Sequence, residues 1–171
     1  CDVDDKRAAD GYKMYPKARK FKDFRVMFDK MHNEIDAVII STPDHTHFAA
    51  TMAAMELGKH VYVEKPLAMN ENEAIAMIQS SKENKVHLMV GHLLQYHPIY
   101  IKVKEMVKSK VLGDIHYIYS NRSSFGKIRT EEDVIWSFAP HDISMILSLM
   151  QDMPISIRAN GINILSSSIS D

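Results

Sequence analysis

Short apolar runs and amphipathic segments alternate over roughly the first two thirds of the chain. The run at 36–43 (DAVIISTP) is continuous, which is typical of a strand buried on both faces of a parallel sheet. The following pattern predicts, in order, helix 45–57, strand 60–63, helix 70–84, strand 86–92 and helix 98–108. Strands and helices that alternate with short connections form βαβ units, so the sequence predicts an α/β fold with a Rossmann-like, doubly wound parallel sheet.

Residues at the ends of these helices indicate where each helix begins or stops. Asp44 is a candidate N-cap and Gly58 a candidate stop for the first of them. Asn70 and Glu73 have the spacing of a capping box, although asparagine stands where serine or threonine is usual. Pro98 is expected at the first position of its helix, where its missing amide hydrogen removes no helical hydrogen bond.

The pattern changes after the last of these helices. Polar and apolar residues alternate over 113–126 and again over 154–165, as in antiparallel strands with one solvated face. A helical pattern at 140–150 lies between them. We therefore expect a Rossmann domain over 1–112. Over 113–171 we expect part of an α+β domain with an open, largely antiparallel sheet.

The composition is that of an ordinary globular protein, and it argues against several function classes. Of 171 residues, 46% are hydrophobic and 25% charged. The net charge is −1 and the basic residues are scattered, so neither a nucleic-acid interface nor a polybasic membrane patch is predicted. No apolar run approaches the roughly 18 residues of a membrane span. The single cysteine, Cys1, fits a reducing compartment, so we expect a cytoplasmic protein.

The first residues, CDVD, have the pattern of a strand end followed by a helix over about 5–14. In dinucleotide-binding folds an acidic residue at such a strand end binds the adenosine ribose. Asp2 is therefore a candidate cofactor residue that favours NAD over NADP, although Lys6 and Arg7 follow closely. A plain turn or N-cap role for Asp2 is the alternative. The glycine-rich turn belongs about 20 residues earlier. The sequence has no GxGxxG, so we expect a fragment of a longer chain.

The segment STPDHTHF at 41–48 lies between a predicted strand and a predicted helix. This is the carboxyl edge of the sheet, where open α/β folds bind ligands. A helix N-terminus there offers free amide N–H groups to polar or anionic groups of a cofactor. Pro43 and Asp44 also suit a simple turn, and both roles can coexist. His45 and His47 lack further ligands at metal-binding spacing, so no metal is predicted.

Lys65 follows a predicted strand in the segment HVYVEKP. Pro66 restricts Lys65 to extended backbone, which keeps the lysine at the end of the strand. An ammonium group at that edge can polarise a hydroxyl or carbonyl oxygen, or carry a proton. Glu64 can balance this charge or bind a cofactor hydroxyl. A solvated Glu–Lys pair is the alternative, and spacing alone favours it.

Residues 41–74 resemble the signature region of the Gfo/Idh/MocA oxidoreductase family, because a strand, Thr-Pro, a helix and GKHVxxEKP follow in that order. The similarity extends over essentially the whole chain, with CDVD as the ribose-binding strand end and LGDIHYI as the entry to the second domain. The resemblance implies a Rossmann domain and a C-terminal domain that carries the substrate face and often an oligomer interface. It also implies hydride transfer between NAD(P) and a sugar, cyclitol or related alcohol.

The resemblance also implies roles for single residues. Lys65 corresponds to the lysine that hydrogen-bonds the reacting hydroxyl, and His141 in SFAPH to the catalytic histidine of a strand-to-helix segment. Ser137 stands where the family often has aspartate, which removes a carboxylate that orients the histidine; Asp142 or the substrate is the candidate replacement. The expected cofactor-binding residues are Asp2, Ser41, Thr42, Pro43, Asp44, His47, Glu64, Lys65 and Pro66.

Residues 121–144 are most similar to the branch that oxidises the 3-hydroxyl of UDP-linked N-acetylamino sugars or their uronates. Arg122, Lys127 and Arg129 are candidates to face a diphosphate or carboxylate, with solvated loop charges as the alternative. Trp136 either stacks on a sugar or fills the core.

Gln95 and Tyr96 stand where many family members have an arginine-rich run, so we expect a differently shaped pocket. The expected substrate-binding residues are Lys65, Tyr96, Arg122, Trp136, His141 and Asp142. The resemblance thus predicts an NAD(P)-dependent dehydrogenase that takes a hydride from a nucleotide-linked amino sugar or uronate and assembles as a homo-oligomer. An NAD-dependent glycosidase that oxidises position 3 transiently and a non-catalytic dinucleotide-binding sensor are the alternatives. The fragment alone is expected to be inactive.

Overall fold

The structure, a computed structural model, describes residues 1–123 and 133–162, and the chain separates into two compact units, Cys1–Gly91 and His92–Asp171. Helices α5 (Pro98–Lys108) and α6 (Val134–Met150) both belong to the second unit. The expected domain limits, 1–112 and 113–171, stay a prediction about functional domains. In the described part of the chain, no helix is long and apolar enough to cross a membrane.

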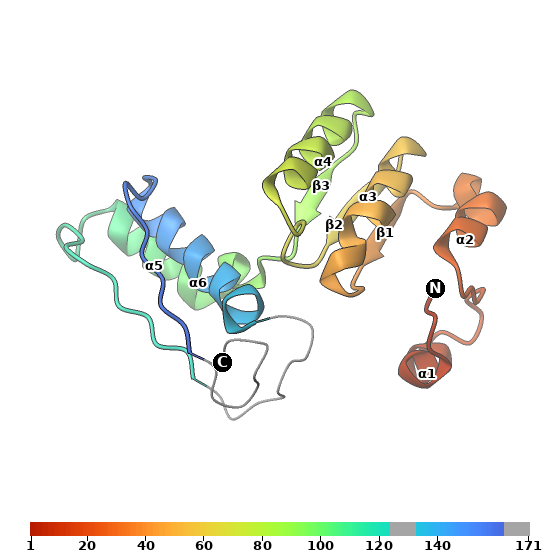
Figure 1. Cartoon of the computed structure of the whole chain (residues 1–171), viewed down its shortest axis with the longest axis horizontal. Helices are drawn as coiled ribbons and strands as arrows, with labels where there is room; N and C mark the ends of the chain where they lie inside the picture. The colour runs from red at the N-terminus through yellow and green to blue at the C-terminus, as the bar shows by residue number, and fades with distance from the viewer. Residues whose placement is uncertain (124–132, 163–171) are drawn as a thin grey trace. The chain divides into compact units, whose positions relative to one another are not determined.

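The first unit is a three-stranded parallel sheet with α-helices, drawn from red to green in Figure 1. The strands lie in the order β1–β2–β3, and Ile40, Val63 and Val90 are in register where the strands end. This alternation confirms the predicted Rossmann-like fold. Along the chain the elements are α1 (Asp5–Met14), α2 (Phe24–Met31), η1 (His32–Glu34), β1 (Ala37–Ile40), η2 (Asp44–Thr46), α3 (His47–Glu56), β2 (His60–Val63), α4 (Glu71–Glu83) and β3 (Leu88–Val90).

The core of this unit lies between one face of the sheet and helices α3 and α4. Val61 and Val63 of the central strand are buried there, together with Met55 of α3 and Met77 of α4. Both helices lie on the same face in Figure 1. On the opposite face Ile39 is 76% exposed, so the prediction that β1 is buried on both faces is wrong for the described residues. Burial of a strand depends on what covers it, which a run of apolar residues does not specify.

The ends of α3 and α4 show which of the predicted capping residues act as caps. Gly58 (φ +71°) ends α3 in a Schellman motif, in which its N–H donates to Met55 O and Lys59 N–H to Ala54 O. The Asn70 side chain caps α4 by accepting from the N–H of Glu73 at 3.0 Å. Asp44 is not the N-cap of α3, because a 3₁₀ turn (η2) begins at Asp44 and the helix proper follows it.

The strand predicted for the first four residues is not formed. Asp2 N–H donates to Phe21 O, but residues 1–4 form no strand ladder. A single backbone hydrogen bond stands where the strand was expected. The predicted helix after it does form, as α1, and Asp4 caps it. A strand requires a partner for its N–H and C=O groups, whereas a helix of this length is stabilised by contacts within its own segment.

The second unit contains η3 (Leu93–Tyr96), α5 and α6 (Figure 1). The Tyr100 hydroxyl of α5 donates to Met145 O of α6 at 2.7 Å, which connects the two helices. Helix α6 begins six residues earlier than predicted: Asp133 caps it, and Pro140 lies inside it. Neither 113–123 nor 154–162 forms a strand, so the antiparallel sheet is not present in the described residues, and the rest of those two predicted strands lies outside them.

Candidate functional site

The carboxyl ends of the three strands bring most of the predicted cofactor-binding residues to one edge of the sheet. Glu64 N–H donates to Ile40 O at 2.9 Å, and Gly91 N–H donates to Val63 O at 2.8 Å. These two bonds extend the parallel ladder by one residue. The segments 41–44 and 64–66 therefore begin side by side, with Gly91 next to the second, as expected for the ligand-binding edge of an open α/β sheet.

Lys65 lies at the end of the central strand on a well-packed piece of backbone. Its own side chain is half-buried, whereas Pro66 and Ala68 after it are buried. The Lys65–Pro66 peptide bond is cis. Burial of the following residues fixes the backbone from which the ammonium group extends. This position agrees with the expectation that the lysine is held at the strand end.

The Glu64 carboxylate is packed against Tyr62 and Gly91. The Tyr62 hydroxyl donates to Glu64 Oε1 at 3.2 Å. A Cβ added to Gly91 would lie only 2.8 Å from Glu64 Oε2 and 2.8 Å from the Tyr62 hydroxyl oxygen. Gly91 is thus required for the close approach of this carboxylate. Tyr62 and Gly91 were not predicted as site residues, although a glycine directly after the apolar residues of β3 was an available signal.

His47 lies in the core of the first unit, and its predicted contact with the cofactor stays a prediction. Its side chain is 0% exposed. Nδ1 lies 2.7 Å from Pro66 O, and Nε2 lies 3.0 Å from Thr42 O. Both ring nitrogens are therefore occupied by backbone carbonyl groups inside the protein. His47 follows a 3₁₀ turn in a helix that packs on the sheet, so its side chain enters the core.

The remaining residues of the loop after β1 are more accessible. Ser41, Thr42 and Pro43 are exposed. Thr46 Oγ1 lies 2.6 Å from Thr42 Oγ1 and 2.7 Å from Pro43 O, which fixes the shape of the loop. Asp44 Oδ2 is buried and has no hydrogen-bond partner among the described residues. Hydroxyl and carboxylate oxygens at this edge, with the Lys65 ammonium group, fit the hydroxyls and amide of a nicotinamide nucleotide.

Asp2 forms a turn at the start of the chain. Its Oδ1 accepts a hydrogen bond from Asp4 N–H at 2.8 Å, which is an Asx turn. This is the turn role that was the alternative to ribose binding. A ribose contact of Asp2 stays a prediction.

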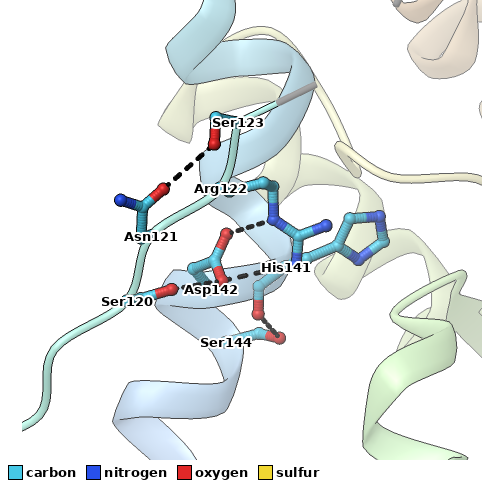
Figure 2. A network of polar contacts seen from close by, with 7 residues as sticks. All are labelled: Ser120, Asn121, Arg122, Ser123, His141, Asp142 and Ser144. Carbon is cyan, nitrogen blue, oxygen red and sulfur yellow. Dashed lines mark hydrogen bonds and ion pairs between the residues drawn. The ribbon is translucent and has the colours of Figure 1, made fainter. Parts of the chain in front are cut away.

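In the second unit, a polar network surrounds Asp142 (Figure 2). Its carboxylate accepts hydrogen bonds from Arg122 Nε at 2.7 Å and from Ser120 Oγ at 2.9 Å. Burial acts to raise the pKa of Asp142. The hydrogen bonds from Arg122 and Ser120, with the electrostatic effects of Arg122 and His141, outweigh this effect and lower the pKa of Asp142 below its ordinary value of 3.8. Arg122 is thereby held to α6 instead of extending freely into solvent.

His141 lies inside α6 rather than in a strand-to-helix connection, because the helix already begins at Val134. Its carbonyl oxygen accepts from Ser144 Oγ at 3.0 Å, and its ring extends away from the segment that carries Ser120 (Figure 2). Ser137 is 7% exposed and lies one helical turn before His141. Residues four apart share a helix face, so the two residues lie on the same face of α6. The correspondence of Ser137 to the family's aspartate stays a prediction.

The other predicted substrate-binding residues are dispersed over this unit. Tyr96 is 60% exposed at the end of η3, and Trp136 is 37% exposed in the first turn of α6. Gln95 Nε2 donates to Ser144 O of α6 at 2.8 Å, and the differently shaped pocket expected at Gln95 and Tyr96 stays a prediction. Lys127 and Arg129 lie outside the described residues.

Comparison with known proteins gives consistent matches. The profile of an oxidoreductase family with an NAD-binding Rossmann fold, Gfo/Idh/MocA, matches residues 1–92. UDP-N-acetylglucosamine 3-dehydrogenase of Acidithiobacillus ferrooxidans is 33% identical over 135 residues, which are 78% of this chain and 42% of that protein.

Solved structures agree with this assignment. UDP-N-acetylglucosamine 3-dehydrogenase from Acidithiobacillus ferrooxidans matches with a TM-score of 0.72 at 28% identity, over 94% of this chain and 49% of that chain. An inositol dehydrogenase homolog complexed with NAD+ from Azotobacter vinelandii matches with a TM-score of 0.59 at 30% identity, over 66% of this chain and 30% of that chain. The chain thus spans less than half the length of these relatives.

Proposed function

Because the chain belongs to the Gfo/Idh/MocA family of oxidoreductases with an NAD-binding Rossmann fold, we propose that the full-length protein oxidises a hydroxyl group of a sugar with NAD. The supporting observation is the position of Lys65, which follows the central strand at the sheet edge within the family-matched residues. Two other candidate groups, the loop after β1 and the Glu64 carboxylate, meet at that edge.

The reaction removes a hydride from the hydroxyl carbon and a proton from the hydroxyl oxygen, and leaves a carbonyl product. Bound NAD would supply the hydride acceptor. Lys65 donates a hydrogen bond to the substrate oxygen and stabilises the negative charge that develops on it. His141 is the candidate acceptor of the hydroxyl proton, with Ser137 as its neighbour on the helix face. Glu64 accepts a hydrogen bond from a hydroxyl of the bound cofactor.

For the substrate, we propose a nucleotide-linked N-acetylamino sugar or its uronate. The support is the 33% identity to a protein named UDP-N-acetylglucosamine 3-dehydrogenase. The candidate substrate contacts are Tyr96, Trp136 and Arg122. The hydrogen bond from Arg122 to Asp142 holds the guanidinium group in place. A cytoplasmic location and assembly into a homo-oligomer belong to the same proposal.

The test is the absorbance of reduced nicotinamide when the full-length protein is mixed with NAD and UDP-N-acetylglucosamine, with inositol as a second substrate. Lys65→Ala should lose most of the turnover and retain cofactor binding, whereas Lys82→Ala, an exposed lysine of α4, should behave as wild type. NAD binding without turnover of any tested alcohol would identify a sensor. Release of an aglycone without net reduction of NAD would identify a glycosidase. Wild-type turnover of Lys65→Ala would refute the role of Lys65.

A further inference from the structure

We infer that His47 is a positioning residue, which connects the segment that carries Lys65 to the loop after β1 and thereby sets the position of Lys65. The kinetic part of this inference rests on the proposed function, because it requires Lys65 to act on a substrate. The structural part, a connection between two loops through one buried ring, does not.

The connection consists of two short contacts between one fully buried imidazole and two backbone carbonyl oxygens. Nδ1 lies 2.7 Å from Pro66 O, and Nε2 lies 3.0 Å from Thr42 O. Carbonyl oxygens only accept, so each bond requires an N–H on the ring.

These two contacts lie directly beyond the end of the sheet ladder, next to Lys65. The sheet ladder between β1 and β2 ends with the bond from Glu64 N–H to Ile40 O, one residue before Lys65. Beyond that point the His47 ring joins the two loops, with one bond to the carbonyl of the residue directly after the lysine. Misplacement of a catalytic group by about 1 Å can lower turnover by about 100-fold.

The experiment compares His47→Ala, His47→Gln and His45→Ala in the full-length protein. His45 is an exposed residue of the same loop and serves as the matched control. We expect His47→Ala to lower kcat per folded molecule by roughly 10- to 100-fold, with a smaller change in NAD affinity. His47→Gln should recover part of kcat, because its amide N–H group can donate to one of the two carbonyls. His45→Ala should keep the wild-type kcat.

A second readout does not depend on turnover. Amide hydrogen exchange at Leu67, Ala68 and Met69 should accelerate in the His47 variants and not in His45→Ala, while exchange in α4 stays unchanged. If His47→Ala does not fold, His47→Gln decides both readouts. Unchanged exchange and unchanged kcat in the His47 variants would overturn the inference, and so would a uniform acceleration that includes α4. Absence of turnover in the wild type would instead refute the proposed function, and hydrogen exchange would still decide whether the connection exists.

Discussion

Replacement of Gly91 by alanine tests whether the Glu64 carboxylate binds the cofactor. The new Cβ would lie 2.8 Å from Glu64 Oε2, 2.8 Å from the Tyr62 hydroxyl oxygen and 3.0 Å from Glu64 Cδ. Favourable contacts between such atoms need about 3.5–4.0 Å, so these side chains must move by roughly 0.5–1 Å. The substitution therefore displaces the carboxylate without removing it.

The effect on stability should be small. The crowded atoms are the ends of the Glu64 and Tyr62 side chains rather than backbone, so rotation relieves the contact. Loss of the bond between Tyr62 and Glu64 costs about 0.5–1.5 kcal/mol. Alanine in place of glycine at a compatible backbone position contributes about 0.4–1 kcal/mol through the unfolded state. We expect the free energy of unfolding of Gly91→Ala to lie within about 1 kcal/mol of the wild-type value.

The effect on the cofactor should be large by comparison. A hydrogen bond to a charged group contributes about 1.5–3 kcal/mol, so its loss weakens NAD binding roughly 10- to 100-fold. The assay is an NAD titration of the full-length protein together with urea unfolding. Gly11→Ala is the matched control, because nothing lies within 4 Å of a Cβ at that helical position. It should stabilise the protein by about 0.5–1 kcal/mol and leave NAD affinity unchanged.

A double mutant separates the mechanism from a general disturbance of the site. If Gly91→Ala acts through Glu64, it should have no further effect on NAD affinity in a Glu64→Ala background. Wild-type affinity of Gly91→Ala would refute the reasoning. An equal loss of affinity in both backgrounds would also refute it.

Three further predictions follow from single residues. Asn70→Ala should lower the free energy of unfolding, measured in urea, by about 1 kcal/mol, because α4 loses its N-cap. The control Asn72→Ala, at an exposed position of the same helix, should leave it unchanged. The pKa of Asp142 is lower in the folded protein than its ordinary value of 3.8. The ionised Asp142 therefore contributes its full stabilisation above pH 3.8, and this stabilisation is lost as the pH falls through the pKa of the folded state. Asp142→Asn should therefore reduce the acid sensitivity of unfolding measured below about pH 4, and an unchanged slope would contradict the assignment. Asp2→Ala should reduce the preference for NAD over NADP in affinity measurements, and a clear NADP preference of the wild type would refute the ribose role of Asp2.

Sequence alone determined the features that depend on neighbours within one short segment. The helix predicted from Pro98 extends to Lys108, as observed, since proline suits the first position and the apolar spacing continues to that end. Gly58 stops α3 because the required backbone angle, φ +71°, is one that glycine adopts readily. The position of Lys65 at a strand end was also predictable, because strand β2 and Pro66 are both local signals.

Tertiary structure decided the features that depend on partners distant in sequence. Ile39 is exposed, although its strand was expected to be buried on both faces, and His47 is buried in the core. Each depends on which element packs against it. The alternating segment at 113–123 forms no strand, since alternation describes two faces and supplies no partner for the backbone. Arg122 donates a hydrogen bond to Asp142, and the two residues lie on different segments of the chain. No local pattern indicates this pairing. Local sequence thus specified the end of α3 and the limits of α4 and α5, whereas the start of α6, burial, strand pairing and the partners of charged groups required the folded chain.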